Sequence, residues 1–132
     1  MNKQTRRKAA EYMQNRKDKY IRKYIDIGVC DERGAVFHAT AVNLPGGEFG
    51  MCVLAVNGNV LTVYDTDSKK PVGAKMYTVP LKNAKDIMIN DSFFSELIKG
   101  YSLKFIYDGA TYKFKNAYSQ KDALAVIRSE AK

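Results

Sequence analysis

Apolar and polar residues follow two different periodicities along this chain of 132 residues, and the change comes near residue 24. In the first part, four apolar or aromatic side chains recur at spacings of four, seven and four, as on one face of a helix: Ala9, Met13, Tyr20 and Tyr24. From Ile25 onward the period is two, which is typical of β-strands. We therefore predict a helical arm over residues 1–24 and a separate, β-rich domain over residues 25–132.

Turn residues divide the second part into strands. Ile25, Ile27 and Val29 alternate up to an Asp31-Glu32-Arg33-Gly34 turn, and a second apolar run follows from Ala35 to Leu44. This pattern predicts a first hairpin, which ends at Pro45-Gly46-Gly47.

A second hairpin is predicted around Asn57-Gly58, between Met51 to Val56 and Asn59 to Tyr64. Asn-Gly suits a two-residue type I′ turn, because both central positions need a positive φ. We expect the segment from Asp65 to Lys75 to be a loop, followed by strands at Met76 to Pro80 and Ala84 to Ile89. Asp91 then caps a short helical turn that Gly100 closes.

A third hairpin surrounds Asp108-Gly109. A two-residue turn there pairs Phe105 with Tyr112 and Leu103 with Phe114 on one face, and Lys104 with Lys113 on the other. A surface that stacks nucleic-acid bases needs aromatic and cationic side chains on the same face. The aromatic face is therefore predicted to be a wall of the core.

The chain ends in a predicted amphipathic helix. Ser119-Gln120-Lys121-Asp122 is a capping box, and apolar residues on one side of the following segment include Leu124 and Ile127. Antiparallel strands followed by one such helix indicate an α+β fold that is mostly antiparallel β, with the helix covering an open end of the sheet.

Positive charge is concentrated in the arm. Residues 1–24 hold nine Lys or Arg residues against Glu11 and Asp18, a net charge of +7, and the remaining residues contribute only +1 of the total of +8. Such a helix can be a solvated one, can dock on its own domain, can pair with a partner helix, or can bind an anionic surface such as nucleic acid or acidic lipid.

The residue types argue against catalysis. His38 is the only histidine and lies in a predicted strand, so neither a histidine-based triad nor a multi-histidine metal site can be assembled. Cys30 and Cys52 form no CxxC motif and are expected to be buried free thiols. Asp65 and Asp67 lack the further oxygen ligands of a calcium loop. We expect neither enzyme activity, nor a cofactor, nor a metal site.

Composition points to a soluble protein. Hydrophobic residues make up 45% of the chain, yet no uninterrupted apolar stretch approaches the roughly 18 residues of a membrane span. The basic start is followed by more charge instead of the apolar segment of a signal peptide, so we expect a cytoplasmic location.

From about residue 48 to residue 131 the order of motifs resembles the bacterial pleckstrin-homology-like (PH-like) domains. The similar segments are GMCVLAVNGNVLTVYDTD, YTVPLKNAKDIMI and SFFSELIKGYSLKFIYDGATYKFKNAYSQKDALAVI. The resemblance implies two roughly orthogonal sheets that form a partly open barrel, plugged at one end by the C-terminal helix. The basic N-terminal helix, predicted from its periodicity, precedes this domain and lies outside the match. The first predicted hairpin would supply the early strands.

The resemblance also implies a binding module, since PH-like folds serve lipid, peptide and protein partners. Members that bind phosphoinositides carry a basic cluster in the first hairpin loop, whereas the loop at Asp31 to Gly34 is acidic here. We therefore expect a protein or peptide partner, with an acidic lipid surface or nucleic acid at residues 1–24 as the alternative. The candidate anion-binding residues are Arg6, Arg7, Lys8, Arg16, Lys17, Lys69, Lys70 and Lys75.

Overall fold

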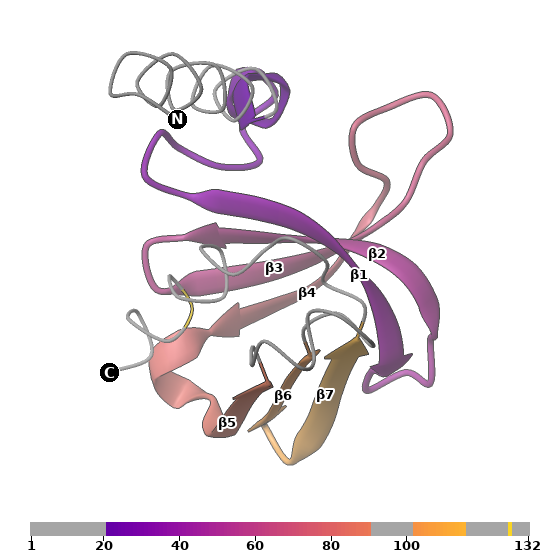
Figure 1. Ribbon diagram of the computed structural model, residues 1–132, viewed down its shortest axis with the longest axis vertical. Coiled ribbons are helices and arrows are strands. Elements are labelled where there is room, and N and C mark those ends of the chain that lie inside the picture. Colours follow the sequence, from indigo (N-terminus) through magenta and orange to yellow (C-terminus); the bar gives the residue numbers. More distant parts are fainter. Residues whose placement is uncertain (1–20, 91–101, 116–126, 128–132) are drawn as a thin grey trace, which may run out of the picture.

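A computed structural model of the chain describes residues 21–90, 102–115 and 127. Residues 21–26 are helical, and a 3-10 helix, η1 (Leu81–Asn83), lies between two strands. Figure 1 shows the strands wrapped around a common interior, with the helical residues above β1. The strands are β1 (Ala35–Asn43), β2 (Gly50–Asn57), β3 (Val60–Asp65), β4 (Lys75–Pro80), β5 (Lys85–Asn90), β6 (Ser102–Tyr107) and β7 (Ala110–Lys115).

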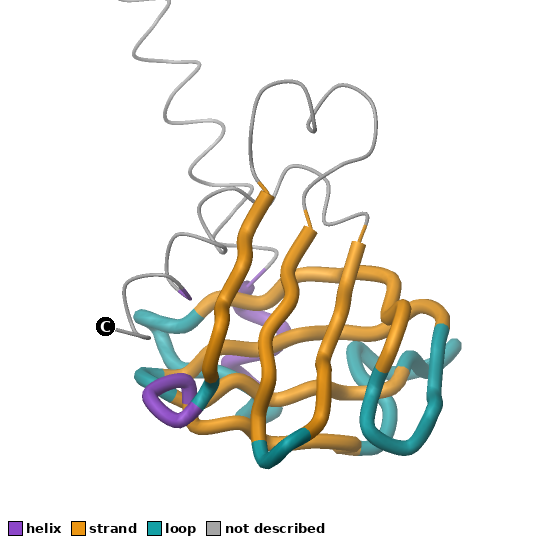
Figure 2. The backbone as a smooth tube through the Cα atoms, turned by 90° about the horizontal axis from the view of Figure 1, so that it is seen from below, coloured by secondary structure: helices purple, strands orange, loops and turns teal. Residues whose placement is uncertain are grey.

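Antiparallel hydrogen bonding links the described strands into one open sheet in the order β4-β3-β2-β1-β7-β6-β5. β1 joins two halves of the sheet, β2–β4 on one side and β5–β7 on the other. It pairs with β2 from Ala35 to Ala41 and with β7 from Thr40 to Asn43, with a bulge between Ala41 and Asn43. A bulge bends its strand, and β5–β7 cross the strands behind them steeply (Figure 2). The expectation of two sheets is corrected accordingly: one continuous sheet bends over at β1, because that strand pairs on both sides.

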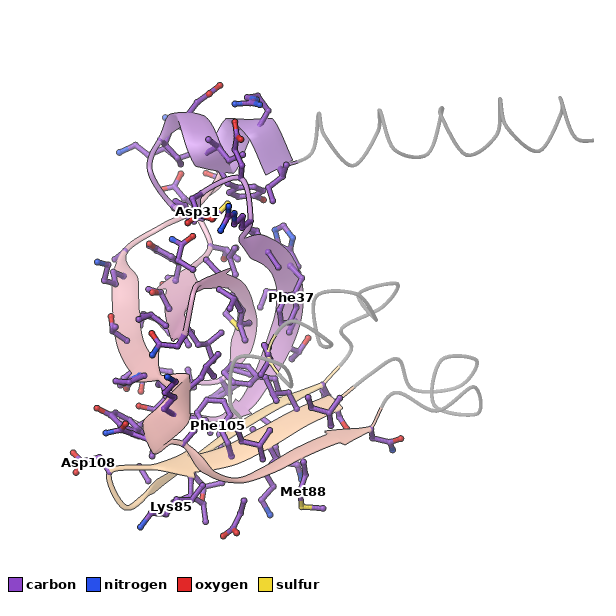
Figure 3. All side chains as sticks on the ribbon, turned by 90° about the vertical axis from the view of Figure 1, so that its left-hand side faces the viewer. Asp31, Phe37, Lys85, Met88, Phe105 and Asp108 are labelled. Carbon is purple, nitrogen blue, oxygen red and sulfur yellow. The ribbon has the colours of Figure 1, made fainter. Side chains whose placement is uncertain are left out.

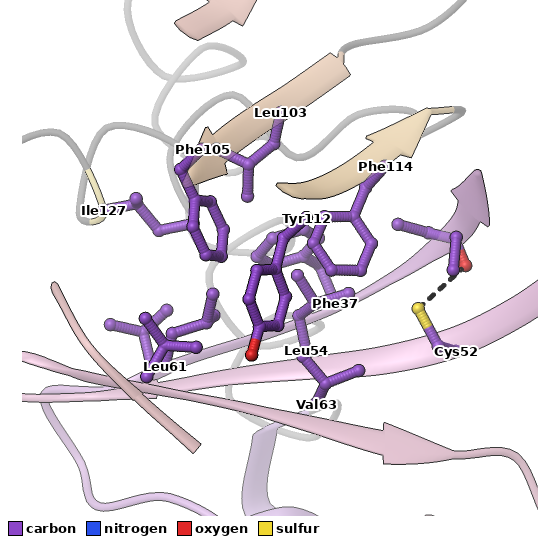
Figure 4. Close-up of a cluster of buried hydrophobic side chains, with 14 of the residues drawn as sticks. Phe37, Cys52, Leu54, Leu61, Val63, Leu103, Phe105, Tyr112, Phe114 and Ile127 are labelled. Atoms are coloured by element: carbon purple, nitrogen blue, oxygen red, sulfur yellow. Dashed lines mark hydrogen bonds between the residues drawn. The ribbon is translucent and has the colours of Figure 1, made fainter. Parts of the chain in front are cut away.

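The concave side of this sheet holds the main core, which we call the inner cluster. Its largest side chains include Phe37, Phe105 and Phe114, and each is at most 1% exposed. Phe37 and Phe105 point into the space between the two halves, whereas Lys85 and Met88 point away from it (Figure 3). Figure 4 shows how side chains from β1–β3 meet those of β6 and β7.

The last hairpin has the predicted register. Phe105 pairs with Tyr112 and Leu103 with Phe114, around a turn in which Asp108 and Gly109 both have a positive φ. The Phe105 and Tyr112 rings stack with centroids 4.9 Å apart. The prediction that this aromatic face is a core wall is confirmed.

The second hairpin forms, but its predicted turn was wrong by one residue. Asn57 pairs with Val60, so the two loop residues are Gly58 and Asn59. Of these two only Gly58 has a positive φ, which is the pattern of a type II′ turn. Asn57 instead fixes a distant segment: its side chain accepts a hydrogen bond from the Asp31 amide (2.7 Å) and donates one to the Val29 carbonyl (3.0 Å).

The predicted strand from Ile25 to Val29 was also wrong. The helix continues through residue 26 and ends at Gly28, whose φ is +79°. The Val29 amide bonds to the Tyr24 carbonyl (2.9 Å) and the Gly28 amide to the Ile25 carbonyl (3.0 Å), which together form a Schellman motif. The first hairpin is therefore β1–β2, and its loop is residues 44–49 instead of residues 31–34.

The end of the helix covers the convex face of the sheet. Tyr24 and Val29 pack with Val36 of β1 and Val53 of β2 in a second group, the outer cluster, which also contains Cys30 and Ala55. Because neighbouring strand residues point to opposite faces, β2 is buried on both sides. The last turn of the helix thus docks on its own domain, while the boundary between residues 24 and 25 stays a prediction.

Two predicted helical segments lie outside the described residues: the turn from Asp91 to Gly100 and the start of the C-terminal helix at Ser119. Ile127, the one described residue of the predicted C-terminal helix, is helical and fully buried in the inner cluster.

Candidate functional site

Three of the predicted anion-binding residues lie on one side of the molecule, in and beside the β3–β4 loop (residues 66–74). Lys69, Lys70 and Lys75 are all exposed. Asp67 lies among them and accepts hydrogen bonds from the amides of Lys69 (2.7 Å) and Lys70 (3.0 Å). These bonds lower the pKa of Asp67, so its negative charge persists at neutral pH. The remaining candidates, Arg6, Arg7, Lys8, Arg16 and Lys17, lie outside the described residues.

The loop of the corrected first hairpin carries no cation. Residues 44–49 read Leu-Pro-Gly-Gly-Glu-Phe, so Glu48 is the only charged residue among them. The basic cluster that the resemblance associates with phosphoinositide binding is therefore missing from this loop. The sequence pattern placed this loop at residues 31–34, and the structure corrects its position to residues 44–49.

Tyr77 of β4 holds this β1–β2 loop in place. Its hydroxyl donates to the Glu48 carboxylate, with O–O distances of 2.8 and 2.5 Å, and accepts a hydrogen bond from the Gly46 amide (2.9 Å). The Tyr77 ring in turn meets the buried Tyr112 ring edge to face, with centroids 5.6 Å apart. The loop is thus tied through Tyr77 to the inner cluster.

The same contacts set the ionisation of the pair. The hydrogen bond from Tyr77 lowers the pKa of Glu48, and the carboxylate raises the pKa of the Tyr77 hydroxyl. Glu48 is therefore an anion and Tyr77 a neutral donor around neutral pH, which is the arrangement their hydrogen bond requires.

Glycines make the tight course of this loop possible. A Cβ at Gly46 would lie 2.3 Å from the Glu48 Oε1 atom, so a side chain there would displace the carboxylate. Gly47 has a φ of +82° and donates its amide to the Leu44 carbonyl (2.9 Å). The two glycines together allow a loop conformation in which the Leu44 side chain is buried and the Phe49 side chain is exposed.

Large apolar side chains are exposed where β1 and β2 meet this loop. Phe49 is 85% exposed, Met51 is 58% exposed and Val42 is 41% exposed; we call these three residues the Phe49 surface. They lie at the loop end of the hairpin, because Ala41 and Gly50 form the last strand pair before the loop and Thr40 and Met51 form the pair next to it. Sequence analysis missed this surface, and its only signal was a phenylalanine directly after a glycine-rich turn.

A small pocket of about 110 Å³ adjoins the Phe49 surface. Phe49 and Met51 line it together with apolar residues of the inner face, and the charged residues among its described lining are Glu48 and Asp65. The full lining is Ala41, Leu44, Glu48, Phe49, Gly50, Met51, Cys52, Asp65 and Met76.

Burial shifts the pKa values of the two cysteines and the histidine among the described residues. Burial raises the pKa of Cys52 to about 12 and also raises that of Cys30, so both remain neutral thiols, and the predicted buried free cysteines are confirmed. His38 is half-buried on β1, where burial and then Lys23 lower its pKa. No group of three or more His, Cys, Asp or Glu side chains in residues 21–90, 102–115 and 127 could hold a metal ion. In the same part of the chain no helix is both long and apolar enough to cross a membrane.

Comparisons with known proteins identify the fold. Models of protein families give no match, and curated proteins give none. Among solved structures, the chain is similar to the crystal structure of the pleckstrin homology domain of ArhGAP27, with a TM-score of 0.50 and 15% sequence identity. The similarity covers 76% of this chain and 98% of that domain. At this identity it shows a PH-like fold alone, and membership of the bacterial PH-like domains stays a prediction.

Proposed function

We propose that this protein is a non-catalytic interaction module that binds a protein or peptide partner through the Phe49 surface. PH-like domains commonly bind lipids or proteins, so the fold supports a binding role without choosing the ligand. We further propose that it acts in the cytoplasm and needs no cofactor.

The observation that carries the proposal is an exposed aromatic side chain on a loop that is already ordered. Burial of a phenylalanine contributes on the order of 2 kcal/mol, and aromatic residues are frequent anchors of interfaces. The contacts of Tyr77 with Glu48 and Gly46 fix the loop before any partner arrives. Ordering therefore costs little on binding, which favours affinity.

Peptide selection tests the proposal. A phage-displayed library of random peptides is selected on the immobilised full chain, and enrichment is compared on Phe49→Ser and Met51→Ser. Met88→Ser is the matched control, because Met88 is a similarly exposed methionine on β5 (64% against 58% for Met51). We expect enrichment to be lost with the first two variants and retained with Met88→Ser. Equal enrichment on all variants, or loss with Met88→Ser alone, would refute the proposed surface.

A second candidate function is the binding of an anionic surface by the arm, which the +7 charge of residues 1–24 favours. Deletion of the arm is an unsuitable test, because Tyr24 and Ile21 pack in the outer cluster. Replacement of Arg6, Arg7, Lys8, Arg16 and Lys17 by Gln removes charge without removing those contacts.

If the Phe49 surface is the main site, the full chain and this neutralised variant bind phosphatidylserine vesicles and duplex DNA equally weakly at physiological salt. Flotation and gel-shift assays measure this. Tight binding by the full chain alone would establish the arm as the binding element instead.

A further inference from the structure

We infer that the partner segment carries an aliphatic side chain next to lysine or arginine, and that the aliphatic side chain enters the pocket beside Phe49 while the cation meets Glu48 and Asp65. This inference rests on the proposed function and names the chemistry of the partner at the same surface.

The size of the pocket favours an aliphatic anchor. Its volume of about 110 Å³ is smaller than the roughly 150 Å³ cavity that accepts a benzene ring. Ala41, Leu44 and Met76 line it with apolar atoms, and Phe49 and Met51 extend this apolar area outward. A leucine, isoleucine or valine side chain therefore fits within the pocket, whereas a larger aromatic ring would extend out of it.

The charges at the pocket favour a cation. Both charged residues among its described lining are carboxylates, Glu48 and Asp65, and none of the exposed lysines of the β3–β4 loop or β4 lines it. Asp65 uses its Oδ1 atom to accept the amide of Thr66 (2.8 Å). A carboxylate offers about four acceptor positions, so each of the two can also accept a hydrogen bond from a guanidinium or ammonium group.

The same charges disfavour an anionic ligand at this place. A phosphate or carboxylate group on the partner would face two like charges, and like charges opposed across an interface weaken binding. An anionic membrane surface would bring many such groups at once. The observations therefore favour a basic, apolar peptide segment over an acidic lipid surface.

The composition of the selected peptides tests this inference separately from the proposed function. Peptides whose enrichment depends on Phe49 should contain an aliphatic residue flanked by Lys or Arg. Phe49-dependent peptides that are acidic or uncharged would overturn the inference and leave the proposed function standing. If no peptide depends on Phe49, both fall.

Charge variants give a second readout with the most enriched peptide, labelled with fluorescein. Asp65→Asn keeps the Oδ1 acceptor but removes the charge, and should weaken binding two- to fivefold, as expected for one partly exposed ion pair of up to about 1 kcal/mol. Asp86→Asn, an equal charge change at an exposed position on β5, should leave the affinity unchanged. Equal effects of the two variants would overturn the inference, as would binding to phosphatidylserine vesicles that Phe49→Ser abolishes.

Discussion

Phe105 is one of the largest fully buried side chains of the inner cluster. Its ring stacks on Tyr112 and lies 6.4 Å from the Phe114 ring, centroid to centroid, and it has no exposed surface. Truncation of such a side chain removes transfer energy and leaves a cavity. We expect Phe105→Ala and Phe114→Ala each to lower the free energy of unfolding by about 3 to 5 kcal/mol.

Urea denaturation measures these changes. Phe49→Ala is the matched control, because the same truncation at an exposed phenylalanine leaves no cavity and should change stability by less than about 0.5 kcal/mol. Wild-type stability in Phe105→Ala would mean that the aromatic face is not a core wall.

His38 makes stability depend on pH. Burial, and then the charge of Lys23, lower its pKa in the folded state below the value of about 6.5 in the unfolded chain. Between these two pKa values the unfolded state binds more protons than the folded state does. The contribution of neutral His38 to folding stability is therefore complete above about pH 6.5 and is lost as the pH falls through the folded pKa. Glu48 and Asp67 also have lowered pKa values. Their contributions to stability are lost only when the pH falls below the ordinary carboxyl pKa values, which is below the range in which His38 titrates.

We therefore expect the urea concentration at the unfolding midpoint to decrease when the pH is lowered from 7.5 to 5.5. The decrease should be smaller in His38→Gln than in the wild type. Parallel pH curves for the two proteins would show that His38 does not titrate differently in the folded state.

At the scale of elements, Gly28 decides where the helix ends and β1 can begin. Its φ of +79° lies in the left-handed region, and a Cβ there would meet nothing within 4 Å. A side chain at position 28 would therefore destabilise the fold only through the unfavourable backbone conformation, and not through a steric clash. Gly28→Ala should lower the free energy of unfolding by about 1 kcal/mol, and Gly28→Asn by less, because Asn tolerates this conformation better.

Urea denaturation distinguishes these variants as well. If Gly28→Ala were as stable as the wild type, the Schellman motif would not be needed for the helix end to dock.

Local sequence pattern predicted a hairpin correctly where only one turn position was compatible with the residues present. Asp108-Gly109 fixed the last hairpin, because both residues adopt the positive φ of a type I′ turn. The register of the second hairpin could not be predicted, since a turn at Asn57-Gly58 and one at Gly58-Asn59 put the same side chains on the same face. The hydrogen bonds of Asn57 to residues 29 and 31 accompany the observed register, and contacts between residues so distant in sequence leave no local pattern.

The helix end was misread for a related reason. Ile25, Ile27 and Val29 alternate as in a strand, yet Ile21, Tyr24 and Ile25 follow helical spacing over the same stretch. Gly28 was the signal that could have decided between them, because glycine commonly follows the last turn of a helix.

At the scale of the whole molecule, the sheet bends at β1, so that its two halves enclose the inner cluster. The same strand leads into the loop that carries Phe49. The succession of strands from residue 35 onward was predictable from local pattern, and the PH-like fold is supported by a similar solved structure. Their union into one continuous sheet was not predicted, because the pairing of β1 with β7 joins segments about 70 residues apart in the chain. The Phe49 surface was not predictable, because periodicity gives no exposure for a loop residue and the Tyr77–Glu48 bond joins residues 29 positions apart.

A chemical-shift map of the full chain shows directly whether a peptide partner binds at the Phe49 surface. The protein has a mass of 14.9 kDa, which suits ¹H–¹⁵N NMR spectra titrated with the most enriched peptide. We expect the largest shifts at Gly46, Gly47, Phe49, Met51 and Asp65. Shifts concentrated instead on β5 around Met88, or on the helix end around Tyr24, would contradict it.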